Sequence, residues 1–250
     1  MLESAELLGF DIALVSVEDV VRQSLYWIES GARNRVICCA NPHSLVVAKS
    51  DVEFRTALVN SDILLPDGMG ITLAWKILRQ RNSGRITGFD YFRALSTSVE
   101  TGRSLRYFFL GSSEEVLVRI ESQIAAIYPY IQFVGAYSPP YKATFSQADD
   151  EEMIEAVNSA APDVLWVGMT APKQEKWIDR NRSRINVPIC VAVGAVFDFV
   201  AGTIKRPQWA SDIGAEWLVR LVQEPRRLWR RNVISAPIFL WDVMRQKYAD

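Results

Sequence analysis

Short runs of β-branched and aromatic residues alternate with longer segments of helical periodicity along most of this chain. Such alternation is typical of βαβ units, in which helices connect parallel strands and cover both faces of a sheet. It predicts an α/β fold with a Rossmann-like parallel sheet. The expected strands lie at residues 10–15, 35–40, 62–66, 105–110, 131–135, 163–168 and 188–193. The clearest expected helices lie at residues 17–30, 51–60, 69–80, 114–127 and 150–160.

Composition and charge narrow the class of protein. The chain has 250 residues, of which 49% are hydrophobic, enough for a full core. Its 28 basic and 29 acidic residues give a net charge of -1, so charge offers no argument for a nucleic-acid partner. Cys38, Cys39 and Cys190 lack CxxC spacing and lie in apolar runs, which favours buried, reduced thiols of a cytoplasmic protein.

The chain also lacks the sequence signals of export. The first residues are acidic where a signal peptide carries Lys or Arg, and no apolar run approaches the roughly 18 residues of a spanning helix. We therefore expect a protein that is neither secreted nor threaded through a membrane.

The composition changes near residue 203. Beyond it the chain is rich in Arg and Trp and loses strand alternation, which predicts an α/β domain at 1–203 and a helical appendage at 204–250. A face that mixes cations with tryptophans suits an anionic membrane surface or a pyrophosphate head group. The alternative is a helix packed on the domain, with its arginines extended into water. The candidate arginines for such a contact are Arg206, Arg220, Arg226, Arg227 and Arg230.

In open parallel sheets, ligands bind beyond the carboxyl ends of the strands, so the residues that follow each strand are candidates for a site. One candidate is Asp67, which follows the strand at 62–66. Pro-Asp-Gly is an ordinary turn sequence, but a shielded carboxylate at this place can also take a proton from an attacking hydroxyl as a general base.

A second candidate is the loop at 168–175. Its Gly, Thr and Pro residues and Lys173 lie between a strand and a helix start, where N–H groups and a cation suit a diphosphate. A plain strand-to-helix loop with Pro172 in the first helical turn is the alternative. No GxGxxG or GxxxxGK[ST] motif is present, which argues against a dinucleotide oxidoreductase or a P-loop NTPase.

His43 is the only histidine in the chain. With no second His or Cys at metal-ligand spacing, we expect a hydrogen-bonded structural residue and no metal site.

Several motifs occur in an order that is more specific than any one of them. They are Ala40-Asn41-Pro42-His43, Leu65-Pro66-Asp67-Gly68-Met69-Gly70, Arg85-Ile86-Thr87-Gly88-Phe89-Asp90, Pro172-Lys173-Gln174-Glu175, Val193-Gly194-Ala195-Val196-Phe197-Asp198, Arg206-Pro207-Gln208-Trp209 and Glu224-Pro225-Arg226-Arg227. Through these motifs most of the chain resembles the WecG/TagA/CpsF family of glycosyltransferases, glycosyltransferase family 26.

The resemblance implies an inverting enzyme without metal or other cofactor. Such an enzyme moves a sugar from a UDP-sugar to a sugar on a polyprenyl diphosphate, at the inner face of the cell membrane, in exopolysaccharide or cell-envelope glycan synthesis. Asp67 matches the proposed base, while Asn41, Arg85, Gln174 and Asp198 match residues of the sugar-nucleotide pocket. Lys173 beside the diphosphate is our own expectation.

The resemblance implies that the appendage brings the active site to the membrane, with arginines such as Arg220, Arg226, Arg227 and Arg230 contributing to the site. Many members have Thr where this chain has Cys39, beside the presumed sugar. The donor therefore stays open among N-acetylmannosamine, its uronic acid and glucose. A sugar-nucleotide hydrolase or epimerase, a non-catalytic scaffold subunit of an envelope complex, and self-association also remain open.

Overall fold

A computed structural model describes residues 2–80, 84–99, 103–203 and 230–249. Within these residues a parallel sheet of six strands forms the centre of the molecule, in the order β4-β3-β8-β7-β5-β6. The strands are β3 (Arg35–Ala40), β4 (Ile63–Pro66), β5 (Leu105–Gly111), β6 (Ile131–Tyr137), β7 (Val164–Gly168) and β8 (Ile189–Ala192). Each lies within two residues of its expected range, so the predicted parallel sheet is confirmed.

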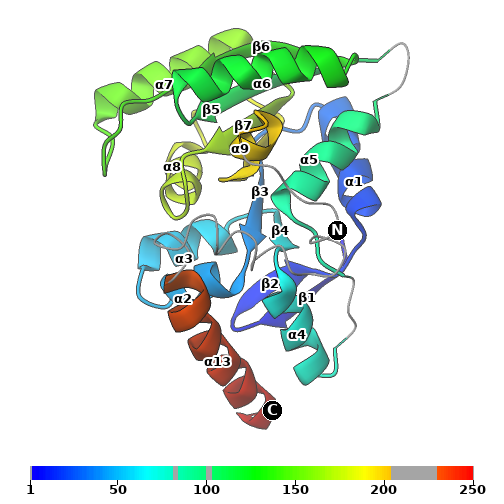
Figure 1. The fold of residues 1–250 in the computed structure, drawn as a ribbon, viewed down its shortest axis with the longest axis vertical. Helices are drawn as coiled ribbons and strands as arrows, with labels where there is room; N and C mark the ends of the chain where they lie inside the picture. The colour runs from blue at the N-terminus through cyan, green and yellow to red at the C-terminus, as the bar shows by residue number, and fades with distance from the viewer. Residues whose placement is uncertain (1, 81–83, 100–102, 204–229, 250) are drawn as a thin grey trace.

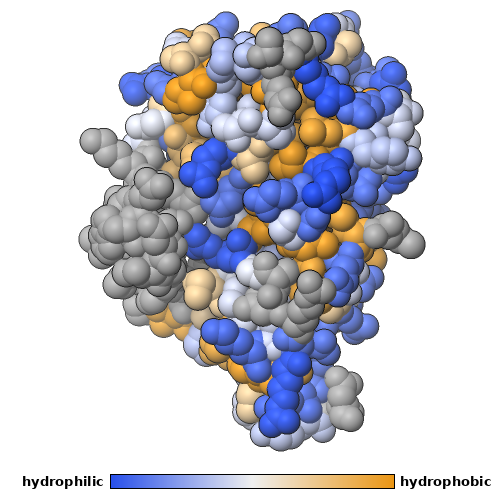
Figure 2. Space-filling view, turned by 90° about the vertical axis from the view of Figure 1, so that its right-hand side faces the viewer, coloured by the Kyte–Doolittle hydropathy of each residue, from blue (hydrophilic) through white to orange (hydrophobic). Residues whose placement is uncertain are grey.

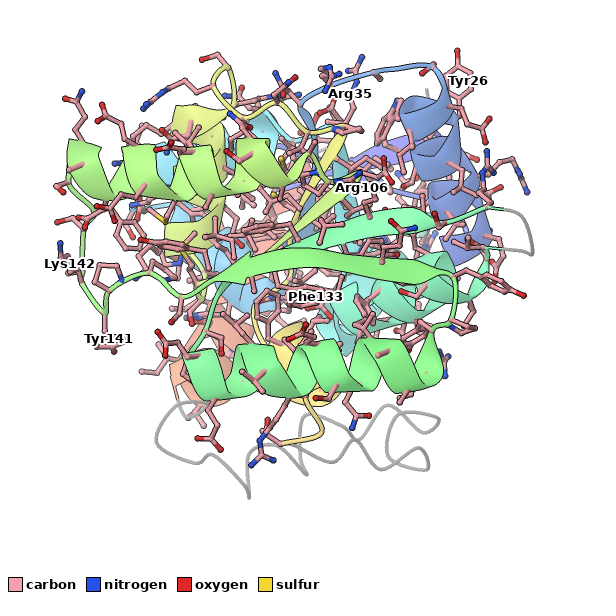
Figure 3. The ribbon with its side chains drawn as sticks, turned by 90° about the horizontal axis from the view of Figure 1, so that it is seen from above. Tyr26, Arg35, Arg106, Phe133, Tyr141 and Lys142 are labelled. Carbon is pink, nitrogen blue, oxygen red and sulfur yellow. The ribbon has the colours of Figure 1, made fainter. Side chains whose placement is uncertain are left out.

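Helices cover both faces of this sheet (Figure 1). One face carries α1 (Val17–Glu29), α5 (Gly88–Thr97), α6 (Glu114–Ile127) and α9 (Val196–Val200). The other carries α3 (Val52–Val59), α7 (Gln147–Ala160) and α8 (Lys173–Asn181). Figure 3 shows β6 between α7 and α6, with Phe133 on the side of α6. The strands other than the edge strand β6 are largely buried on both faces, which explains their continuous apolar runs.

The N-terminal strand differs from expectation. Residues 10–13 form a strand, β2 (Phe10–Ala13), but it pairs with β1 (Ser4–Leu7) in a separate antiparallel hairpin instead of joining the parallel sheet. Leu8 and Gly9 form the turn with φ of 55° and 79°, the backbone of a two-residue hairpin turn. The sequence pattern shows an apolar strand there but contains no information on its partner.

Side-chain caps set the starts of several helices. Ser113 accepts a hydrogen bond from the Val116 N–H at 3.5 Å and begins α6 at the expected place. Helix α7 begins three residues earlier than expected, because Ser146 and Asp149 form a reciprocal capping box.

The chain ends in a short π-helix, η1 (Arg230–Ser235), and in α13 (Ala236–Ala249). Helix α13 packs against α2 (Pro42–Ala48) and α4 (Met69–Ile77), and buries Phe239 and Val243 completely in the shared core. Lys49 Nζ and Asp242 Oδ2 form an ion pair at 2.8 Å across this contact. This part of the expected appendage therefore packs on the α/β domain.

Residues 204–229 lie outside the described residues, so the boundary at residue 203 stays a prediction. Figure 2 shows that the end of the molecule where α13 projects carries hydrophilic and hydrophobic residues side by side. In the part of the chain that the structure describes, no helix is both long and apolar enough to cross a membrane.

Candidate active site

A cavity of about 510 Å³ lies beyond the carboxyl ends of β4, β3, β8 and β7, which are neighbours in the sheet. Cys39 at the end of β3, Asn41 just after it, and Asp67 just after β4 contribute to its wall. Arg85 comes from the segment before α5, and Gln174 from the first turn of α8. The fold therefore brings these five predicted residues, separated by up to 135 positions in sequence, to one cavity.

Asp67 occupies the first position beyond β4. Its backbone N–H donates to the carbonyl oxygen of Ala40 at 2.8 Å, which extends the pairing of β4 with β3 by one residue. Gly68 follows with φ of 92°, a backbone conformation that strains other residues, and caps α4. Gly70 then packs so tightly on Pro42 that an added Cβ would lie 2.2 Å from the proline Cγ. The Pro-Asp-Gly sequence is thus a turn that also places Asp67 in the cavity wall.

Asn41 has a structural role as well as a place in the cavity. It caps α2, and its Oδ1 accepts hydrogen bonds from the N–H groups of His43 and Ser44, both at 3.1 Å. Pro42 at the first helical position has no N–H to satisfy. Because Oδ1 is occupied, Nδ2 is the polar atom of this side chain that is available to donate to a ligand.

His43 lines the cavity and contacts a residue just before the C-terminal helix α13. Its Nδ1 lies 2.8 Å from the Oγ of buried Ser235, and His43 and Ala236 both line the cavity. The expected hydrogen-bonded role of His43 is observed. Among the described residues, no group of three or more His, Cys, Asp and Glu side chains is arranged to hold a metal ion.

Gln174 and Glu175 line the cavity from the first turn of α8, and each side chain is only 3% exposed. Gln174 Nε2 donates to Glu175 Oε1 at 2.9 Å. Burial raises the pKa of the Glu175 carboxyl to about 7. Sequence patterns alone do not identify Glu175 as a site residue, because a glutamate in the first turn of a helix is usually solvated. Its one signal was its place in the Pro172-Lys173-Gln174-Glu175 motif.

Two predicted residues do not line this cavity. Lys173 Nζ donates to the carbonyl oxygen of Lys142 at 2.9 Å and lies 4.6 Å from the centre of the Phe145 ring. Figure 3 places Lys142 at the edge of the molecule, on the loop after β6. Asp198 belongs to α9, whose neighbouring residues Val196 and Phe199 do line the cavity. The roles assigned to Lys173 and Asp198 stay predictions.

The predicted arginines of the appendage lie almost entirely beyond what the structure describes. Arg206, Arg220, Arg226 and Arg227 fall within 204–229, outside the described residues, and Arg230 is placed only as the first residue of η1.

Cys38 and Cys190 are buried, as expected, and burial raises the pKa of the Cys190 thiol to about 12. Both therefore stay thiols at neutral pH. Cys39 is half-buried and lines the cavity, so it is the cysteine that can contact a ligand.

The fold and the cavity define a Rossmann-like α/β protein with a candidate ligand site, lined by polar and apolar residues, at the carboxyl edge of its sheet. The sequence model of the glycosyl transferase WecG/TagA/CpsF family matches residues 5–250, and the chain belongs to this family of glycosyltransferases.

Curated relatives agree with this assignment. Over 214 residues the chain is 30% identical to the N-acetylglucosaminyldiphosphoundecaprenol N-acetyl-beta-D-mannosaminyltransferase of Bacillus subtilis strain 168, covering 85% of this chain and 80% of the relative. Over 244 residues it is 24% identical to the Staphylococcus aureus strain MW2 protein of the same name, covering 97% of this chain and 92% of that protein.

Proposed function

We propose that this glycosyltransferase moves a sugar from a UDP-sugar to a sugar carried on a polyprenyl diphosphate, with Asp67 as the general base. The main support for the proposal is that Asp67, Asn41, Arg85 and Gln174 line one cavity at the carboxyl ends of the strands. The names of the relatives, which specify an acceptor on diphosphoundecaprenol, support the acceptor class.

The proposed reaction is a single displacement with inversion at the anomeric carbon. Asp67 takes the proton of the acceptor hydroxyl, whose oxygen forms the new bond to the anomeric carbon as the bond to the UDP oxygen breaks. The UDP leaves with the electron pair of that bond. The Arg85 guanidinium, at the same cavity, supplies positive charge for the departing diphosphate.

For the donor, we propose a UDP-hexose or UDP-N-acetylhexosamine. The relatives are named as N-acetylmannosaminyl transferases, which makes UDP-N-acetylmannosamine the first donor to test. Cys39 contributes a thiol to the cavity wall, so its size and weak hydrogen bonding act on the choice among UDP-N-acetylmannosamine, its uronic acid and UDP-glucose.

We also propose that the enzyme works as a peripheral protein on the inner face of the cell membrane. Support comes from four apolar side chains near the start of α13 that are 39% to 68% exposed, although η1 ends and α13 begins beside the cavity. They are Val233, Ile234, Ile238 and Trp241. Apolar side chains near the entrance of a site suit a substrate that is anchored in lipid.

A transfer assay tests the proposed reaction. Purified enzyme is given a short-chain prenyl-diphosphate-linked N-acetylglucosamine and each UDP-sugar in turn, for the wild type, Asp67→Asn and Asp11→Asn. Asp11 is exposed on β2 and does not line the cavity, so its variant controls for the substitution itself. We expect transfer from one donor, a loss of roughly 10²–10⁴-fold in kcat for Asp67→Asn, and no change for Asp11→Asn.

Other outcomes would point elsewhere. Release of UDP without transfer would indicate a hydrolase, and full transfer by Asp67→Asn would remove Asp67 from the role of base.

A further inference from the structure

Glu175 is a buried carboxyl group that the proposed reaction does not use. It lines the cavity, is 3% exposed, and has a pKa of about 7 because burial disfavours its charge. A buried charge lowers stability unless hydrogen bonds compensate it. Its placement in the wall of a ligand site therefore needs a reason beyond packing.

The contact between Glu175 and Gln174 fixes the direction of the glutamine amide. The ionised form of Glu175 only accepts hydrogen bonds, so in that form the 2.9 Å contact places the Gln174 nitrogen toward Glu175. The other end of the amide, Oε1, is then turned away from Glu175. An amide on Gln174 without this neighbour has no such preference, because its two ends are nearly equal in shape.

Two oxygens of this pair lack a partner. Gln174 Oε1 and Glu175 Oε2 are buried, and neither makes a hydrogen bond within the part of the chain that the structure describes. Buried polar atoms without partners are rare in native proteins, and each calls for an explanation. Both residues line the same cavity, so these oxygens are candidates to accept a hydrogen bond from a bound ligand that carries donors.

The hydrogen-bonding capacity and charge of Gln174 and Glu175 indicate which group of a ligand could bind beside them. Both oxygens accept hydrogen bonds, and a carboxylate repels phosphate oxygens. On this helix, Lys173 is held at the Lys142 carbonyl and Lys176 pairs with Asp51 at 2.6 Å, and neither lysine lines the cavity. This wall therefore suits hydroxyl or N–H donors on a neutral ring and not a diphosphate.

We infer that Glu175 is a positioning residue, which holds the Gln174 amide so that its oxygen accepts a hydrogen bond from a neutral ring of the donor substrate. The inference rests on the proposed function, since a UDP-sugar offers such donors at two places, the hydroxyl groups of the sugar and the N–H of the uracil.

Calorimetric binding of UDP and of UDP-N-acetylmannosamine tests the inference in four proteins: wild type, Glu175→Gln, the double variant Gln174→Glu with Glu175→Gln, and Asp179→Asn. Asp179 lies on the same helix but accepts from Asn60 and does not line the cavity. In Glu175→Gln the new amide can donate or accept, so Gln174 is no longer held in one direction. The double variant exchanges the two side chains. The amide at position 175 can then donate to the carboxylate at position 174, which again offers an oxygen to the cavity.

We expect Glu175→Gln to weaken binding of the UDP-sugar roughly tenfold while UDP binding changes less than about twofold. The double variant should recover most of the loss, Asp179→Asn should bind like the wild type, and in the transfer assay Glu175→Gln should raise the donor KM more than it lowers kcat. An equal loss for UDP and UDP-sugar supports the same role with the uracil as the bound ring.

Wild-type affinity of Glu175→Gln for both ligands would overturn the role of Glu175 alone. Wild-type protein that binds neither ligand would overturn the proposed function, and the inference with it.

Discussion

The backbone N–H of Asp67 donates to the carbonyl oxygen of Ala40 at 2.8 Å, one residue before Asn41. This bond holds the proposed base next to the loop that follows β3, and it involves no side-chain atom of Asp67. We therefore predict that Asp67→Asn removes activity without unfolding the protein. Thermal unfolding should show a midpoint within about 2 °C of the wild type, since asparagine keeps the size of the side chain and a change of about 0.5 kcal/mol shifts the midpoint by no more than that. A large drop in the midpoint would mean that lost activity reports lost structure.

Gly70→Ala should destabilise the protein by about 1–3 kcal/mol, because the new methyl group would lie 2.2 Å from the Pro42 ring. Without that contact, alanine in a helix would instead stabilise the protein by about 0.5–1 kcal/mol. A loss of stability would therefore support the tight contact with Pro42, and a gain would contradict it. Urea unfolding measures it.

Gly31→Ala is the control for Gly70→Ala, since Gly31 has open space around it and only a φ of 69° to strain. It should cost about 1–2 kcal/mol and leave activity unchanged.

Glu175 should make stability fall as the pH rises. Its pKa is raised from 4.5 unfolded to about 7 folded, so between these values the folded state binds more protons than the unfolded state. The stability contributed by the protonated carboxyl is present below about pH 4.5 and is lost as the pH rises through 7. Relative to Glu175→Gln, the ligand-free wild type should lose on the order of 3 kcal/mol between pH 4.5 and 8. Urea unfolding of both proteins across this range measures the difference, and a constant difference would contradict the prediction.

Asp149 provides a comparison of opposite sign. Lys142 and then Ser146 lower its pKa to about 2, so its contribution is present above about pH 4 and is lost as the pH falls toward 2. Comparison of Asp149→Asn with the wild type in acid should show this reversed trend.

Phe239→Ala should cost about 3–5 kcal/mol, because Phe239 is fully buried where α13 joins the core. Tyr248→Ala on the same helix removes a ring that is 77% exposed and should change stability by no more than about 0.5 kcal/mol. Chemical denaturation of both variants gives the comparison. Equal, small effects would show that α13 is not part of the folded core.

Trp241→Ala should weaken binding to phosphatidylglycerol vesicles by several-fold, measured by co-sedimentation, since Trp241 is 68% exposed on α13 and suits the headgroup region. Tyr141→Ala is the matched control, because Tyr141 is a fully exposed aromatic residue on the loop after β6 (Figure 3). Unchanged binding of Trp241→Ala would remove this surface from the proposed membrane contact.

Much of the fold could be predicted because it depends on local patterns. The apolar runs that became β3, β4, β5, β7 and β8 are largely buried on both faces, and such strands are recognisable from sequence. The pairing of β2 was not predictable, because a four-residue strand pattern fits a hairpin as well as a parallel sheet. The same limit applies to α13. The burial of its residues Phe239 and Val243 depends on contacts with α2 and α4, which the sequence pattern does not reveal.

The sequence by itself determined the α/β class, the places of the strands and the family motifs, since these depend on periodicity and residue identity along the chain. Tertiary structure alone decided that Asp67, Asn41 and Gln174 share a cavity while Lys173 turns to the Lys142 carbonyl. It also decided that Glu175 is buried beside Gln174 with an unpaired oxygen, as judged over the described residues. The physical reason is that burial, and with it the pKa of a carboxyl and the direction of an amide, is set by neighbours that are distant in sequence.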